Sequence, residues 1–134
     1  MILVDTNVWS ENAKPNGVRK VVDWIVTHRD HLWLSTIVIA EFQAGIENPA
    51  AIHMRDRLQT WLSELEAVNS HRTLPFDSRA AHVLGKLLLA KPQDKKILDT
   101  LLAAQALSRD CPIATRNVRD FGWTGAKLIN PWEA

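Results

Sequence analysis

Four short apolar runs along the chain have the pattern of buried β-strands. The first, residues 2–4, is apolar and largely β-branched, and it stops abruptly at Asp5. Continuous apolar character over so few residues is typical of a strand that is covered on both faces. Three further runs share this character. We therefore predict strands at residues 2–4, 32–34, 111–115 and 128–129.

Between the strands, apolar residues recur at spacings of three and four, which is the pattern of amphipathic helices. The clearest case is the set Val18, Val21, Val22 and Ile25, which all fall on one helix face. Cap residues and chain breakers then set the expected ends of the other segments. The predicted helices cover residues 18–28, 36–44 with an end at Gly45, 49–68 as one long helix, 78–90, and 99–107.

Strands that alternate with helices predict an α/β fold, specifically a three-layer α/β/α sandwich with a short, mostly parallel sheet. The 134 residues, 46% hydrophobic and 23% charged, suit one domain that spans residues 1–134. Ligands of such sheets bind outside the carboxyl ends of the strands. This rule directs attention to Asp5, to the segment after Leu34 and to the segment after Thr115.

The composition says more about where the protein is located than about what it does. No apolar run is long enough to span a membrane, and the N-terminal residues lack the basic and apolar regions of a secretory signal. Cys111 is the single cysteine, which suits a reducing compartment. We expect a cytoplasmic protein without a membrane partner. The net charge of +1 neither requires nor excludes a nucleic-acid partner.

Four carboxylates stand near the predicted ligand-binding edge: Asp5, Glu41, Asp99 and Asp120. Each has a plain structural explanation. Asp5 and Asp99 can cap turns or helices, and Asp120 can pair with a neighbouring arginine. Glu41 is more informative, because it stands in an otherwise apolar stretch where an unpaired charge is costly. A cation near Glu41 is therefore expected.

If the four carboxylates converge, their repulsion has to be neutralised. The chain has no cluster of Cys and His at zinc-binding spacing. Oxygen ligands suit hard divalent cations, so the pattern favours one or two Mg²⁺ or Mn²⁺ ions. Such a pocket can activate water and stabilise the oxygens of a phosphodiester during hydrolysis, which indicates nuclease chemistry.

Four ordered motifs also carry a family resemblance. They are Leu3-Val4-Asp5-Thr6-Asn7-Val8; Ser35-Thr36 with Ile39-Ala40-Glu41-Phe42 and Gly45; Asp99 with Leu102-Ala103-Ala104 and Ala106; and the run from Ala114 to Phe121. Together they resemble the PIN-domain ribonucleases, in particular the VapC-type toxins and the related FitB. The likeness extends over nearly the whole chain.

The resemblance implies a metal-dependent endoribonuclease that cuts single-stranded or looped RNA. It also implies a homodimeric toxin of a VapBC-type toxin–antitoxin module, held inactive by a cognate VapB-type antitoxin. By the same likeness, Asp5 and Asp99 are the principal ligands of Mg²⁺ or Mn²⁺, and Glu41 holds the metal or orients its water. Asp120 matches the last acidic position of the family.

Neighbouring polar residues follow from the same likeness. Thr6, Asn7 and Thr115 are expected to hydrogen-bond the carboxylates. Some relatives have an Asp where this chain has Asn117, so either Asn117 or Asp120 faces the metal.

The chain departs from the family before the third acid, where residues 93–98 replace a Gly-Arg pair and a longer loop. Lys95, Lys96 and Arg116 are candidate contacts to RNA phosphates.

Two other functions remain open from the sequence. One is a PIN module that binds RNA without cutting it. The other is a phosphohydrolase with an aspartyl nucleophile at Asp5, although Asn7 stands where that class places a second Asp. For the partners, core packing is the default for the tryptophans, and Trp9 is the one that we consider exposed to an antitoxin. Either of two helical surfaces, around residues 58–65 or 83–88, is expected to form the dimer.

Overall fold

The computed structural model describes residues 1–134 and contains a five-stranded parallel sheet. The strands lie in the order β3-β2-β1-β4-β5, with every neighbouring pair parallel. Their bounds are β1 (Ile2–Val4), β2 (Leu32–Ser35), β3 (Thr73–Leu74), β4 (Ile113–Ala114) and β5 (Leu128–Ile129). The first strand is central, so the residue that follows it lies in the middle of the carboxyl edge.

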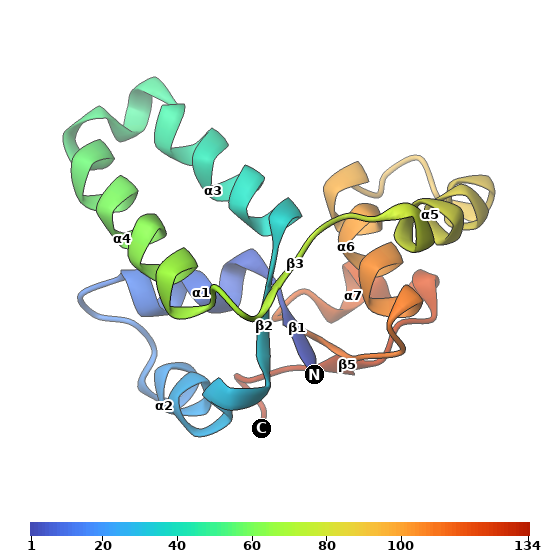
Figure 1. The fold of residues 1–134 in the computed structure, drawn as a ribbon, viewed down its shortest axis with the longest axis horizontal. Helices are drawn as coiled ribbons and strands as arrows, with labels where there is room; N and C mark the ends of the chain where they lie inside the picture. Colours follow the sequence, from blue (N-terminus) through green and yellow to red (C-terminus); the bar gives the residue numbers. More distant parts are fainter.

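Helices lie on both sides of these strands. In Figure 1, α2, α3 and α4 are on one side of β1 and β2, and α5 and α6 are on the other. The α-helices are α1 (Thr6–Ala13), α2 (Arg19–His28), α3 (Thr36–Glu47), α4 (Arg55–Val68), α5 (Ser78–Ala90), α6 (Ile97–Ser108) and α7 (Val118–Phe121). Short 3-10 turns are η1 (Arg29–His31), η2 (Pro49–Met54) and η3 (Gly122–Thr124). The predicted α/β sandwich is confirmed.

The core forms around the central strand. Leu3 and Val4 are fully buried, and they belong to one cluster with Val8 of α1, Leu102 of α6 and Phe121 of α7. Side chains from the helical layers and the sheet thus share one hydrophobic interior. None of the helices combines the length and apolar character needed to cross a membrane.

The chain after β1 is helical, in a segment for which the sequence predicted no helix. Asp5 begins α1 by accepting a hydrogen bond from the backbone N–H of Thr6 at 2.8 Å. The helix turns Val8 and Trp9 inward, and Trp9 is only 3% exposed. The prediction that Trp9 is exposed to a partner is therefore wrong.

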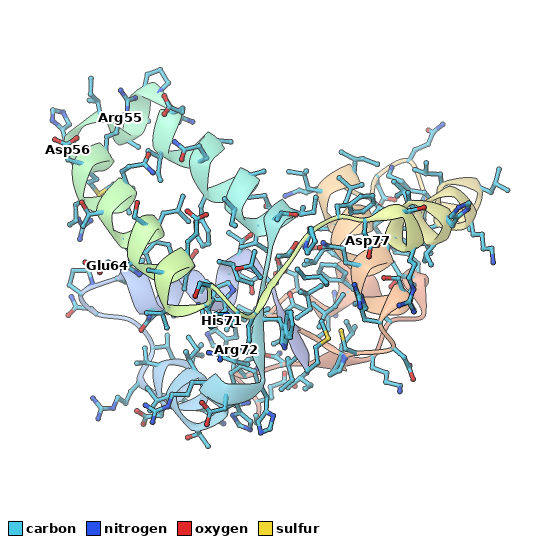
Figure 2. All side chains as sticks on the ribbon, viewed as in Figure 1. Arg55, Asp56, Glu64, His71, Arg72 and Asp77 are labelled. Carbon is cyan, nitrogen blue, oxygen red and sulfur yellow. The ribbon has the colours of Figure 1, made fainter.

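Two helix boundaries also differ from prediction. The helix expected to end at Gly45 continues to Glu47, because Nε and Nη2 of Arg55 donate to the last carbonyls, those of Ile46 and Glu47, at 3.0 and 3.3 Å. Figure 2 shows Arg55 where α3 and α4 meet. The segment predicted as one helix over 49–68 is divided into η2 and α4, since the backbone at Met54 leaves the helical region.

Candidate active site

A cavity of about 640 Å³ opens at the carboxyl edge of the sheet, where α1, α3 and α6 meet. Asp5 follows β1 directly, Glu41 belongs to α3, and Asp99 lies in the first turn of α6. All three carboxylates line the cavity. The carboxylates thus converge at the edge of the sheet where the sequence rule expects a ligand.

Asp5 is the most buried of the carboxylates, at 4% exposure. Its Oδ1 accepts from Thr6 N, and its Oδ2 accepts from Thr115 Oγ1 at 2.8 Å and from Asn7 Nδ2 at 3.1 Å. Burial nevertheless raises the pKa of Asp5 above its ordinary value, although these hydrogen bonds oppose the rise. The charge of Asp120 raises the Asp5 pKa slightly further. A charged Asp5 is therefore held in place but not neutralised.

The side chain of Asn7 ties α1 to the loop after β4. Its Nδ2 also approaches Thr115 Oγ1 at 3.4 Å, and its Oδ1 accepts from the backbone N–H of Arg116 at 3.1 Å. The N–H of Asn117 donates to the same Thr115 hydroxyl at 3.0 Å. These bonds fix the two segments that hold Asp5.

Glu41 faces the same cavity from α3 and is half-buried. Thr6 Oγ1 donates to Glu41 Oε1 at 3.1 Å, so Thr6 contacts two of the carboxylates, one through its backbone and one through its hydroxyl. Burial raises the pKa of Glu41, and the charges of Asp5 and Asp99 add to the rise. Lys96 acts in the opposite direction.

Among the carboxylates of the cavity, Asp99 has the most strongly raised pKa. Burial first, and then the charges of Asp5 and Asp120, raise the pKa of Asp99 from 3.8 to about 6. Lys96, the N-cap residue of α6, and Lys95 lower it. The helix begins at Ile97 rather than at Asp99 as predicted. Asp99 is therefore the third residue of α6, still in its first turn, where the helix dipole favours a negative charge.

Asp120 is placed differently from the other three acids. It lies on α7, its side chain is 46% exposed, and its Oδ1 is 3.7 Å from Lys95 Nζ. Asn117, not Asp120, lines the cavity. Asp120 is close enough for its charge to raise the pKa values of Asp5 and Asp99, but Lys95 is its nearest cation.

The basic residues that the sequence analysis named also differ in whether they line the cavity. Lys96 lines the cavity, whereas Lys95 pairs with Asp120. The guanidinium of Arg116 lies over the ring of Trp132, 5.2 Å from its centre, and outside the cavity lining. Only Lys96 is therefore placed to meet a phosphate inside the cavity.

The carboxylates offer an all-oxygen donor set to a cation. No three Asp, Glu, His or Cys side chains are grouped closely enough to hold an ion by themselves. Mg²⁺ commonly binds through one or two carboxylates and keeps several water molecules. Three repelling carboxylates around a roomy cavity fit that mode of binding, in which Asp5 and Asp99 would hold the ion with Glu41 beside them.

The cavity also contains residues that sequence reasoning missed, namely Ser10, Ile97 and Leu98. Ser10 lies one helical turn after Thr6 and donates to the Thr6 carbonyl at 2.8 Å. The spacing of Thr6 and Ser10 was available in the sequence, but it carries meaning only once α1 is known to be a helix.

Comparisons with known proteins agree with this geometry. Residues 2–122 match the family profile described as PIN domain. The chain is 36% identical to the plasmid stability protein StbB of Pseudomonas syringae pv. tomato, over the full length of both chains. It is 34% identical to the VapC ribonuclease Y4jK of Sinorhizobium fredii, with 99% of each chain covered.

The toxin FitB of Neisseria gonorrhoeae is 32% identical, with 98% of this chain and 99% of FitB covered. The crystal structure of FitAcB from that organism superimposes on the whole chain with a TM-score of 0.86 and 30% identity, and 100% of each chain is covered. Family profile, full-length relatives and fold coincide, and the chain therefore belongs to the PIN domain family.

Proposed function

We propose that this protein is a metal-dependent endoribonuclease that acts as the toxin of a VapBC-type toxin–antitoxin module. The observation that supports the activity best is the single cavity shared by Asp5, Glu41 and Asp99 at the carboxyl edge of the sheet. A relative of matching length is named as a VapC ribonuclease, and another as a toxin. The proposed cofactor is Mg²⁺ or Mn²⁺.

The residues of the chain have distinct parts in this proposal. A bound divalent ion would supply a nucleophilic water and neutralise charge on the phosphodiester. Asp5 and Asp99 would hold the ion, and Thr115, Asn7 and Thr6 keep Asp5 in one orientation. Thr6 orients Glu41, which lines the same space. Lys96 offers the one lysine charge of the cavity lining to the RNA backbone.

The cavity favours RNA that is unpaired at the point of cleavage. Its walls come from three helices, and the reactive carboxylates lie inside it rather than on a flat surface. A single strand or a loop can bring one phosphate into such a space. A paired A-form helix is too wide to enter it, so its phosphates stay outside the cavity. Single-stranded or looped RNA is thus the proposed substrate class.

A separate antitoxin chain and a second copy of this chain are the proposed partners. A ribonuclease that cuts cellular RNA has to be held inactive until it is needed, and the relative FitB is named as a toxin. The homodimer follows from the family likeness together with the exposed apolar side chains of α5, Leu88 and Leu89.

The direct test is cleavage of a mixed single-stranded RNA by the purified protein with Mg²⁺, Mn²⁺ or EDTA. Asp99→Asn removes one proposed ligand while keeping the side chain's size. Asp94→Asn is the matched control, because Asp94 is exposed in the loop before α6 and does not line the cavity. We expect cutting by the wild type and by the control, and none by Asp99→Asn or in EDTA.

Two outcomes would replace this proposal. Tight RNA binding without cleavage in Mn²⁺ would indicate the module that only binds RNA. A phosphoaspartate trapped at Asp5 would indicate the aspartyl phosphohydrolase.

A further inference from the structure

A buried pair of polar side chains, Ser35 and Gln105, joins the two helices that carry Glu41 and Asp99. Neither side chain has exposed surface, and neither lines the cavity. Ser35 is the N-cap residue of α3, and its Oγ accepts from the N–H of Ile37 at 3.0 Å. The same hydroxyl donates to Oε1 of Gln105, which lies in α6.

Gln105 extends the connection to the edge of the sheet. Its Nε2 donates to the carbonyl of Leu74 at 3.1 Å, and Leu74 is the register partner of Ser35 in the β2–β3 pair. We name this set of hydrogen bonds, from Ile37 through Ser35 and Gln105 to Leu74, the Ser35–Gln105 clasp. The clasp joins the start of α3, the body of α6 and the end of β3.

The chemistry of the clasp indicates a role beyond filling space. An amide and a hydroxyl are costly to bury, and an apolar side chain would fill the same volume without that cost. The neighbours of Gln105 on α6, namely Ala103, Ala104 and Ala106, are fully buried and apolar. A buried polar network whose members all have partners fixes one arrangement of the elements it connects.

The clasp lies at equal sequence distance from two carboxylates of the active site. Glu41 is six residues after Ser35 on α3, and Asp99 is six residues before Gln105 on α6. Six helical residues span about 9 Å, so a tilt of roughly 10° at the clasp displaces either carboxylate by roughly 1.5 Å. A misplacement of about 1 Å can cost an enzyme roughly a hundredfold in rate.

We infer that Ser35 and Gln105 are positioning residues, which set the spacing between Glu41 and Asp99 without touching substrate or metal. The part of this inference that concerns catalysis rests on the proposed nuclease function. The part that concerns the placement of α3 against α6 does not.

The test uses the variants Gln105→Leu and Ser35→Ala, singly and combined. Each single variant leaves the other member's polar group buried without its partner, whereas the double variant removes both groups and recovers part of the lost stability. Ser35→Thr keeps the hydroxyl and is the rescue variant. Asn69→Ala is the matched control, because Asn69 is also buried and also donates to a carbonyl, that of Leu65, but it lies at the end of α4.

Three readouts separate positioning from stability. Mn²⁺ binding, measured by calorimetry, is expected to weaken about tenfold in Gln105→Leu and to stay weak in the double variant although that variant is more stable. In RNA cleavage, kcat is expected to fall while KM is retained, since Lys96 is unchanged. Spin labels on cysteines introduced at Ala44 of α3 and Arg109 after α6, both exposed, are expected to report a broader distance distribution.

The control decides the outcome. If Gln105→Leu matches Asn69→Ala in Mn²⁺ affinity and in label distances at equal loss of stability, the clasp is only a packing feature and the inference is wrong. If the wild type neither binds Mn²⁺ nor cuts RNA, the proposed function fails. The label distances still decide in that case whether the clasp positions the helices.

Discussion

Thr115 Oγ1 donates a hydrogen bond of 2.8 Å to Asp5 Oδ2, although 110 residues separate the two along the chain. The bond is possible because β1 and β4 are neighbours in the sheet, so their carboxyl ends lie side by side. Both residues are buried. The most buried carboxylate of the cavity is thus oriented by a residue at the end of the adjacent strand.

Replacing Thr115 with Val tests this orientation with little change in volume. Loss of a buried hydrogen bond to a charged group is expected to lower the free energy of unfolding by about 2 kcal/mol. Loosening a carboxylate that holds a metal is expected to reduce RNA cleavage roughly 10- to 100-fold. Urea unfolding and a cleavage assay measure the two effects. Thr27→Val, at an exposed hydroxyl on α2 that donates to Asp23 O, is the control and is expected to change neither.

The raised pKa of Asp99, about 6 against an ordinary 3.8, makes the stability of the ion-free protein depend on pH. The folded protein holds this proton more tightly than the unfolded chain does. Its stabilising contribution is therefore complete below pH 3.8 and is lost as the pH rises through about 6. Burial raises the pKa values of Asp5 and Glu41 as well, so their contributions to stability also fall as the pH rises.

We expect the wild type in EDTA to be less stable at about pH 7.5 than at about pH 5. The lowered pKa values of Glu11 and Asp77 interfere little, because the ordinary values, 4.5 and 3.8, already lie below this range. Asp99→Asn removes the repelling charge and should unfold at a higher temperature than the wild type at the higher pH. Equal unfolding temperatures there, measured in EDTA beside Asp94→Asn, would contradict the proposed repulsion.

The elements that the sequence predicted correctly are those whose burial follows a simple pattern. β1 and β2 are apolar runs, and α2 and α5 have apolar faces at helical spacing. Helix α1 was missed because Thr6–Ala13 is mostly polar and its buried residues come from the middle of the segment. Strand β3 was missed because Thr73–Leu74 pairs a polar with an apolar residue and so forms no apolar run.

The same limit applies to the site. Asp5 was placed by the rule that ligands bind at the carboxyl edge of a parallel sheet, Glu41 by the cost of its apolar surroundings, and Asp99 as a ligand only by the family resemblance. Asp120 could not be separated from them, because its pairing with Lys95 depends on how the loop before α6 packs against α7. The sequence did not indicate a role for Gln105 either, since a single glutamine in an apolar helix is expected to face solvent until the structure shows that it is buried.

Gly17 is required by a close approach of two backbone segments. A Cβ at this position would lie 2.0 Å from the carbonyl oxygen of Glu11, a distance that no packing adjustment of a side chain can relieve. The same turn presents the N–H of Val18, the N-cap residue of α2, to Oε1 of Glu11 at 3.0 Å. Gly17→Ala therefore forces apart α1 and the start of α2.

We expect Gly17→Ala to lower the free energy of unfolding by about 3 kcal/mol. Gly85→Ala is the matched control, because Gly85 lies inside α5 and a Cβ there would have nothing within 4 Å of it. Alanine is the better helix former, so this control should stabilise the protein by about 0.5–1 kcal/mol. Chemical denaturation measures both changes, and equal effects of the two substitutions would exclude the close approach at Gly17.

The proposed dimer can be tested at α5, where Leu89 is 93% exposed and Leu88 lies beside it with 46% exposure. A side chain as exposed as that of Leu89 contributes little to the folding of one copy, but it can be buried against a second copy. Leu89→Glu is expected to shift the purified protein from dimer to monomer in light scattering while its unfolding temperature at low concentration stays the same. Val26→Glu, at an exposed apolar position of α2 on the other side of the sheet, should leave the dimer intact. If Val26→Glu rather than Leu89→Glu dissociates the protein, the interface lies on α2.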